Sequence, residues 1–236
     1  MEWRKCYLDL VLVPFGLFLN VSYHCWLWRM VRNKPMNTLI GVNSAARRLW
    51  VMAIMKDGDK KNIIAVQTFR NTMMASILMA TTTILICTGL GAVISSTYSI
   101  KKPLNDSIYG AHGEFVMALK YASLLLIFLF AFLFNSLSLR FVNQANYLIN
   151  TPLDPTLIVT VDYVCDLLEK GFILNTVGNR LVYVGLPLLL WIFGPVLVFM
   201  CSVFMIPIFY HLDVFYGKME PGDEGLEGLE EGGMRL

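Results

Sequence analysis

Four long apolar runs, separated by shorter polar connections, constrain this chain more than any motif does. A helix needs about 20 mostly apolar residues to cross the hydrocarbon core of a bilayer. Runs of that length lie at about residues 7–28, 72–95, 115–139 and 181–209. Hydrophobic residues make up 56% of the chain and charged residues only 15%, against about 25% charged in soluble domains. We therefore predict an all-α, polytopic membrane bundle with four transmembrane helices plus cytoplasmic amphipathic helices.

The domain organisation follows from these runs. We assign residues 1–216 to one membrane domain and the acidic, glycine-rich residues 217–236 to a disordered tail. The first run contains Asp9, Asn20 and His24 and no small-residue cleavage site follows it, so we interpret it as a retained span.

Composition and motifs exclude several classes of function. The net charge of +2 does not favour a nucleic-acid partner. The five cysteines and three histidines lack metal-binding spacing, so no metal or cofactor is expected. Hydrolase, metalloprotease and P-loop motifs are also missing from the sequence. We therefore do not expect an enzyme.

The orientation follows from the lysines and arginines, which concentrate on the cytoplasmic side of membrane proteins. The first connection runs from Arg29 to Arg70 and is strongly basic, and the third connection adds Arg140 and Arg180. This asymmetry predicts an integral protein of the plasma membrane or an endomembrane, with the first and third connections cytoplasmic and both termini extracytoplasmic. The second connection would then face outward with Asn105, which stands in an N-x-S glycosylation sequon.

The basic connection is expected to contain an amphipathic helix ending near Lys56. Its apolar face would comprise Ala46, Leu49, Trp50, Ala53 and Ile54. The basic residues Arg47, Arg48, Lys60 and Lys61 would face anionic lipid headgroups. Two alternatives stay open: the helix lies on the leaflet, or it packs on the bundle or on another subunit.

A small set of polar residues in or near the spans forms a candidate polar path or anion vestibule. Asn20 and His24 share one helix face, where they either line a conduit or make interhelical hydrogen bonds. The arginines Arg70, Arg140 and Arg180 would stand at one membrane level, as snorkelling side chains or as an anion-attracting group. The complete candidate set is Asn20, His24, Arg70, Asn135, Arg140 and Arg180.

Two further expectations concern the helices around the third connection. The third span is predicted to continue into the cytoplasm as far as Ile149. A short amphipathic segment, residues 161–169, is predicted to follow it and to end at Gly171. Within the fourth run, Gly194 and Pro195 mark either a static bend or a hinge.

Certain strings of residues are shared with a known family. Residues 65–71 (AVQTFRN) are followed by MMAS and ATT, and residues 178–180 (GNR) are followed by residues 191–195 (WIFGP). In these strings the chain resembles domain of unknown function 599, a family of four-span membrane proteins in plants and bacteria, and most closely its plant branch. The resemblance covers about residues 5–216 and implies a membrane location and four helices. It implies no activity, ligand or catalytic residue.

Two functional hypotheses from different classes remain at the level of the sequence. The first is a homo-oligomeric ion or anion channel or small-solute transporter, which the polar span residues and the proline-interrupted last run favour. The second is a non-conducting scaffold or a protein that binds anionic lipid, which the basic connection favours.

Overall fold

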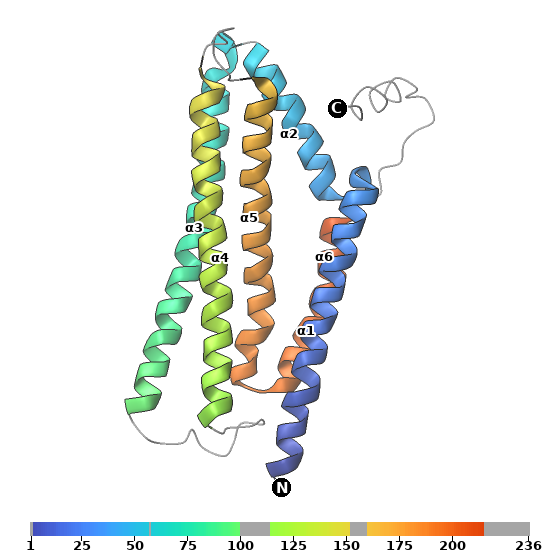
Figure 1. The fold of residues 1–236 in the computed structure, drawn as a ribbon, viewed down its shortest axis with the longest axis vertical. Coiled ribbons are helices and arrows are strands. Elements are labelled where there is room, and N and C mark those ends of the chain that lie inside the picture. Colours follow the sequence, from blue (N-terminus) through green and yellow to red (C-terminus); the bar gives the residue numbers. More distant parts are fainter. Residues whose placement is uncertain (1, 57, 100–113, 152–159, 215–236) are drawn as a thin grey trace.

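The computed structural model describes residues 2–56, 58–99, 114–151 and 160–214, which form long helices joined by short connections (Figure 1). The helices are α1 (Glu2–Asn33), α2 (Leu39–Lys56), α3 (Gly58–Ser99), α4 (Glu114–Ile149), α5 (Val161–Leu189) and α6 (Pro195–Asp213), with the 3-10 turns η1 (Pro35–Asn37) and η2 (Leu190–Ile192). The predicted tail, Asn105 and the side chains of Lys60 and Lys61 lie outside the described residues.

Five stretches of the described chain are long and apolar enough to cross a membrane. They are Leu8–Asn33, Ile63–Ser96, Val116–Ile149, Val161–Ile192 and Pro195–Asp213. The helical membrane bundle is therefore confirmed, but the prediction of four spans was wrong.

The fourth apolar run, predicted as one span over residues 181–209, is divided between two helices. Helix α5 ends at Leu189, and the chain reverses through η2 before α6 begins at Pro195. Gly194 makes this reversal with φ 158° and ψ 157°, a conformation that glycine reaches easily because it lacks a Cβ. Proline suits the first position of the next helix because its missing N–H has no partner there. The predicted bend is thus a helical hairpin.

The missing fifth span comes from helix α5, which also overturns the short segment predicted for residues 161–169. Gly171 does not end a helix: it is buried inside α5 against Val142 and Phe141 of α4. A glycine inside a helix costs about 1 kcal/mol relative to alanine, and the close contact with α4 offsets this. The charged residues of α5 near its start hid its continuity in the sequence.

An odd number of spans changes the placement of the chain ends. Residue Val214, just after α6, forms an antiparallel β-bridge with Thr38, just before α2. The end of α6 therefore lies beside the first connection, whereas the start of α1 lies at the opposite end of the bundle (Figure 1). Five spans would place the two ends of the chain on opposite sides of a membrane, whereas four would place them on one side; the sidedness of the termini stays a prediction.

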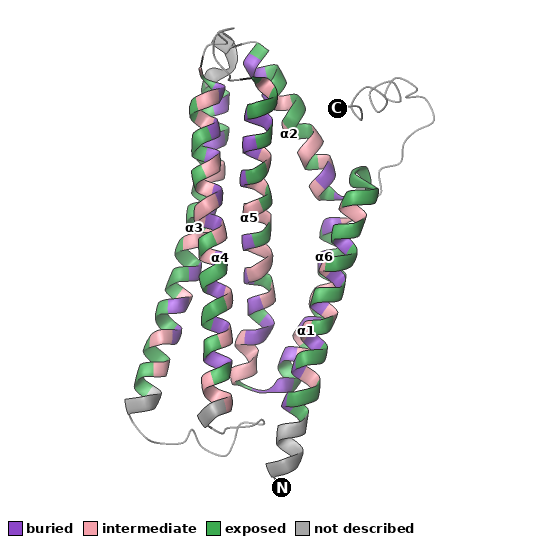
Figure 2. Ribbon diagram, viewed as in Figure 1, coloured by how far each residue is buried: buried purple, intermediate pink, exposed green. Residues whose placement is uncertain are grey.

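The helices group into two units. Helix α4 packs against α3 and against α5, and these three helices are called here the three-helix bundle. Helix α1 packs mainly on α6, and the two run parallel as the α1–α6 pair (Figure 1). Buried residues face the neighbouring helices, and the outward faces of α1 and α3 are largely exposed (Figure 2). Exposed apolar faces of this kind are those expected to contact lipid.

A seven-residue repeat explains the close packing of α4 on α5. Each of three glycines of α5 lies against one residue of α4: Gly171 against Val142, Gly178 against Asn135, and Gly185 against Phe128. Both series repeat every seven residues, the spacing at which two helices keep one face in contact along a left-handed crossing. Small residues allow the close helix approach on which membrane bundles depend.

Filling one of these contacts tests the repeat. Gly185→Leu is expected to lower the free energy of unfolding by about 1–3 kcal/mol, because a Cβ at Gly185 would lie 2.8 Å from Cζ of Phe128. Gly89→Leu is the matched control, since a Cβ there meets nothing within 4 Å. Unfolding of both variants in detergent should separate them. Equal stabilities would contradict the repeat as the basis of packing.

The spacing of charged residues on two helices matches the thickness of a membrane. On α1, twenty residues separate Asp9 from Arg29, and on α4, twenty residues separate Lys120 from Arg140. Twenty helical residues rise about 30 Å, the thickness of the hydrocarbon core. The predicted helical continuation of α4 beyond Arg140 to Ile149 is confirmed, and its position relative to the membrane stays a prediction.

Candidate functional site

The first of two buried charge clusters joins α4 to α1 and η2, and is called here the Lys120 joint. The Lys120 side chain is 1% exposed, and its Nζ lies 3.8 Å from Oδ1 of Asp9. Trp191 Nε1 donates a 2.6 Å hydrogen bond to the same carboxylate oxygen, and the Lys120 ammonium lies 5.4 Å from the centre of the Trp191 ring. Asp9 therefore has a cationic partner on α4 and a hydrogen-bond donor on η2.

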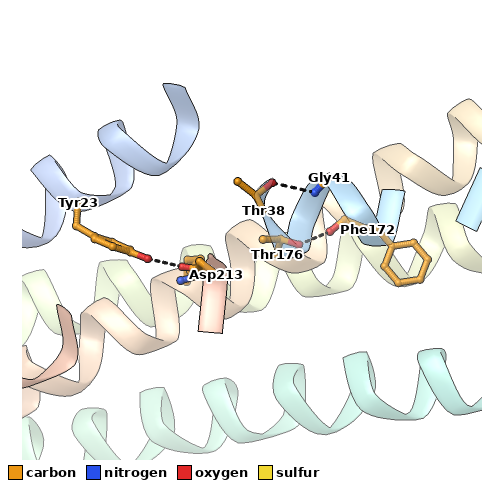
Figure 3. Close-up of polar contacts among 7 residues, drawn as sticks. Tyr23, Thr38, Gly41, Phe172, Thr176 and Asp213 are labelled. Atoms are coloured by element: carbon orange, nitrogen blue, oxygen red, sulfur yellow. Dashed lines mark hydrogen bonds and ion pairs between the residues drawn. The ribbon is translucent and has the colours of Figure 1, made fainter. Parts of the chain in front are cut away.

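The second cluster, the Arg180 joint, connects α5, α6 and α1. Arg180 Nη2 donates to Oδ1 of Asp213, which is 2% exposed. Tyr23 Oη donates a 2.6 Å hydrogen bond to Oδ2 of the same carboxylate (Figure 3). The Phe209 ring stacks on Tyr23 at 5.9 Å and lies 5.2 Å from Cζ of Arg180. A charge within the apolar layer is unfavourable unless an opposite charge pairs with it. Buried ion pairs therefore mark candidate functional sites.

The charges of the two joints are distributed by unit. Both carboxylates, Asp9 and Asp213, belong to the α1–α6 pair, and both cations, Lys120 and Arg180, belong to the three-helix bundle. Fourteen residues of α1 separate Asp9 from Tyr23, which is about 21 Å of helix. The seam between the two units is therefore held by two ion pairs, one toward each end of the α1–α6 pair.

One buried face of α1 connects the two joints. Asp9, Val13, Gly16, Asn20 and Tyr23 are all buried on it. Gly16 gives room to Ser202 of α6, whose Oγ would lie 3.1 Å from a Cβ at that position. This face carries polar groups at intervals through the thickness of the membrane.

Asn20 and His24, predicted as one polar face, bond within α1 rather than between helices. Asn20 Nδ2 donates to the carbonyl of Gly16 at 3.0 Å. His24 Nδ1 lies 2.7 Å from the carbonyl of Asn20 and donates to it. The His24 ring also lies 5.9 Å from the Phe209 ring, edge to face, which places it at the Arg180 joint.

Several polar atoms near the Arg180 joint are buried without a hydrogen-bond partner among the described residues. They include Nη1 of Arg180, Nε2 of His24 and Oδ1 of Asn179. Ser202 Oγ on α6 has the same status. Unpaired buried polar groups are unfavourable, so these atoms mark where a polar ligand or water would be stabilised.

The predicted level of three arginines is only partly observed. Arg70 and Arg140 are exposed on α3 and α4, at nearly the same height because Cys87 of α3 lies beside Leu125 of α4. Arg180 lies about 10 Å deeper, since Gly178 faces Asn135 and seven residues of α4 correspond to that rise. The expectation of one level for all three was therefore wrong.

Asn135 lies between α4 and α5, away from the seam. It is fully buried, and its Nδ2 donates to the carbonyl of Ala131 at 2.9 Å. Its Oδ1 has no hydrogen-bond partner within the described part of the chain.

Helix α2 packs on the bundle, which is one of the two alternatives left open by the sequence. Arg47 Nη2 bonds Oε2 of Glu169 at 2.9 Å, and its guanidinium lies 4.2 Å from the Phe172 ring centre. The helix runs obliquely toward the C-terminal end of α4 and the N-terminal end of α5 (Figure 1). The buried residues of α2 are Gly41, Val51, Ile54 and Met55, whereas Leu49 of the predicted apolar face is 65% exposed. The predicted apolar face was therefore displaced.

A charge exchange tests how α2 is held. Arg47→Glu is expected to lower the free energy of unfolding by about 1–2 kcal/mol, because it replaces a partly buried ion pair and a cation–π contact with repulsion. Adding Glu169→Arg should restore most of the loss. Arg48 pairs with Asp162 at 2.8 Å, but these side chains are 60% and 76% exposed. Arg48→Glu should therefore change the free energy of unfolding by no more than the measurement error. Equal losses of stability for Arg47→Glu and Arg48→Glu would contradict the expectation.

The start of α2 is tied to the Arg180 joint through the chain itself. Asp213 immediately precedes Val214, which pairs with Thr38. Thr38 is fully buried, and its Oγ1 accepts a 3.2 Å hydrogen bond from the N–H of Gly41 (Figure 3). A Cβ at Gly41 would lie 2.2 Å from the carbonyl oxygen of Pro35. This tight connection fixes where α6 ends.

The signals for the two joints were only partly visible in the sequence. Asp9 and Arg180 were recognisable as charges in apolar surroundings, but Lys120 and Asp213 stood at the ends of apolar runs. Tyr23 stood within an apolar run, and Trp191 appeared only in one of the strings shared with the family. Only the packing of distant helices shows that these residues meet.

Comparison with known proteins identifies a family. No curated protein and no solved structure matches the chain significantly. A family model described as "Protein of unknown function, DUF599" matches residues 11–217. The resemblance found in the sequence is confirmed, although its plant branch stays a prediction. A match over most of the chain establishes that this protein belongs to the DUF599 family.

Proposed function

We propose that this membrane protein transports a small polar solute or ion along the seam between the α1–α6 pair and the three-helix bundle. The observation that carries the proposal is the distribution of charge: both carboxylates lie on one unit, both cations lie on the other, and one pair closes each end. Parting of the units at one joint would expose polar groups to one side of the membrane. Alternation between the joints would move a solute across.

The polar face of α1 supports the same proposal. Between the joints, Asn20 of α1 and Ser202 of α6 are buried in the apolar layer. Near the Arg180 joint, His24 and Arg180 hold buried nitrogens with no hydrogen-bond partner among the described residues. Polar side chains at membrane depth face cavities or partners that need them. The route would lie within each subunit, so a homo-oligomer, which we predicted from the sequence, would carry one route per subunit.

The orientation proposed for transport follows from five spans. Lys218 and Arg235 come after α6 and so count with the basic first connection. The asymmetry of positive charge therefore increases, which favours that side as cytoplasmic. The Arg180 joint would then be the cytoplasmic closure and the Lys120 joint the extracytoplasmic one.

Cross-linking across the seam tests the proposal. In a cysteine-free background, Tyr183→Cys and Phe209→Cys place thiols on α5 and α6, where the native rings are 5.7 Å apart. Bridging them with a short, reducible bifunctional reagent should slow solute flux into proteoliposomes at least tenfold, and reductant should restore it. Potassium, chloride, nitrate and urea would serve as probes.

A second cross-link provides the matched control. Phe15→Cys and Phe199→Cys lie within the α1–α6 pair, where the rings are 5.8 Å apart. Bridging this pair should leave flux unchanged, because it does not cross the seam. Equal inhibition by both cross-links would overturn the seam as the route. The lack of flux for every probe in unmodified protein would overturn transport itself.

The non-conducting alternative has its own supporting observation. Four exposed arginines lie near the proposed cytoplasmic surface: Arg29, Arg32, Arg70 and Arg140. They suit anionic lipid headgroups, and we retain lipid with anionic headgroups as a proposed partner. Arg47 is held by Glu169, so α2 offers less free charge to lipid than the sequence suggested. A protein that binds anionic vesicles but passes no probe would support this alternative.

A further inference from the structure

We propose that the transported solute is a small anion that moves together with one proton. This inference rests on the transport function proposed above, and it names the substrate class and the coupling. The anion would pair with Arg180 in place of the Asp213 carboxylate, and that carboxylate would take up the proton. The groups that argue for it are the two joints and the arginines near the cytoplasmic surface.

The preference for anions follows from which charges surround the entrance. Exposed Arg29 on α1 and Arg140 on α4 lie about two helical turns beyond the level of the Arg180 joint. Arginines at an entrance concentrate anions and repel cations. A cation would have to pass this group and then displace a guanidinium from Asp213. An anion meets complementary charge at both steps.

Arg180 is equipped to hold an anion before it releases Asp213. Only its Nη2 is used by Asp213, while its Nη1 is buried with no partner among the described residues. A planar guanidinium binds small oxyanions or carboxylates through two parallel N–H groups, or a halide between them. His24 Nε2 and Phe209 lie at the same joint and would provide a further polar contact and an apolar wall.

The proton is required by charge balance. While Arg180 pairs with Asp213, the joint carries no net charge. An incoming anion that pairs with Arg180 leaves the Asp213 carboxylate charged and unpaired inside the membrane, which is strongly unfavourable. Addition of one proton from water to a carboxylate oxygen of Asp213 removes that charge. One anion and one proton then enter together, and release of both restores the ion pair.

The groups around Asp213 allow this exchange. Arg180 and Tyr183 face the joint from α5, Tyr23 and His24 face it from α1, and His211 lies on its own helix. None of these groups carries a fixed negative charge, so the anion meets no carboxylate other than Asp213 at this joint among the described residues. The Tyr23 hydroxyl bonds Oδ2 of Asp213 and would turn to accept from the protonated acid.

The Lys120 joint holds the same kinds of group toward the other end of the seam, in a looser ion pair with 3.8 Å between Lys120 Nζ and Asp9 Oδ1. Lys120 is the cation and Asp9 the carboxylate, and Trp191 donates to Asp9 much as Tyr23 donates to Asp213. An anion leaving Arg180 would therefore find a second cation with its own proton-accepting partner. The two joints together would let the anion and the proton leave on the same side.

The inference is tested in proteoliposomes that contain a pH-sensitive dye, with chloride or nitrate as the anion probe. An inward gradient of the probe should acidify the interior, and clamping the membrane potential with potassium and valinomycin should not change the rate. Asp213→Asn should lower the proton movement at least tenfold, because an amide takes up no proton at this position. Asp166→Asn, an exposed carboxylate of α5, is the matched control and should behave like the unmodified protein.

The outcomes separate this inference from the proposed function. Anion flux that needs valinomycin and moves no protons would overturn the coupling while leaving transport intact. Flux of potassium or urea without chloride or nitrate would overturn the choice of an anion. The lack of flux for any probe would overturn transport itself. The wild-type measurement decides the coupling by itself, so the conclusion does not depend on whether Asp213→Asn folds.

Discussion

Asp213→Ala is expected to lower the free energy of unfolding by about 3–5 kcal/mol. The substitution leaves the Arg180 guanidinium in the apolar layer without its counter-ion, and it removes the acceptor of the Tyr23 hydroxyl. Removing one partner of a buried pair is costly because the remaining charge stays desolvated. Unfolding by denaturing detergent in bicelles, followed by far-UV circular dichroism, would measure the loss.

Two further variants make this first expectation specific. Arg180→Leu combined with Asp213→Leu should recover most of the stability, since a buried ion pair can often be replaced by apolar residues at little cost. Asp162→Ala removes an exposed carboxylate of α5, whose side chain is 76% exposed, and should have little effect. A loss below 1 kcal/mol for Asp213→Ala would show that the Arg180 joint does not hold the units together.

Lys120→Met is expected to lower the free energy of unfolding by a similar amount, about 3–5 kcal/mol. Methionine has nearly the shape of lysine but leaves the Asp9 carboxylate without its cation and removes the contact with the Trp191 ring. The hydrogen bond from Trp191 to Asp9 would remain, because it does not involve Lys120. The same unfolding measurement in bicelles applies.

The control for this second expectation lies on the same helix. Arg140→Met removes an exposed cation at the other end of α4 and should change stability little. Adding Asp9→Asn to Lys120→Met should restore stability in part, since a neutral amide no longer needs a cation. If the double variant is less stable than Lys120→Met, the ion pair is not the source of the loss.

The glycines of α5 show how far the sequence can predict the packing. Gly171, Gly178 and Gly185 repeat every seven residues in the printed sequence, and such a pattern indicates a close helix contact. The sequence alone is equally consistent with a helix end at Gly171, because glycine is favoured at the C-terminus of a helix as well as at a close helix contact. Which effect dominates depends on whether another helix fills the space. Val142, Asn135 and Phe128 of α4 fill it.

The candidate site was predictable only in part, for a related reason. The sequence marks Asp9 and Arg180 as costly in the membrane but does not show their partners. Asp9 and Lys120 are more than one hundred residues apart in the sequence. Asp213 and Arg180 come together only because the chain reverses direction at Gly194. Contacts of this kind depend on the tertiary arrangement of helices, to which local pattern contributes little.

The sequence by itself determined that the chain is a helical membrane protein, because apolar runs of about 20 residues have few other stable structures in water or lipid. Shared strings of residues indicated the family, which the family match confirms. The sequence also determined the concentration of positive charge around the first and third connections. The number of spans was decided only by the tertiary structure, since the charged start of α5 resembles an extramembrane helix until α4 packs on it. The tertiary structure likewise decided the pairing of charges, because burial makes an isolated charge unfavourable and only the folded bundle brings each cation to its carboxylate.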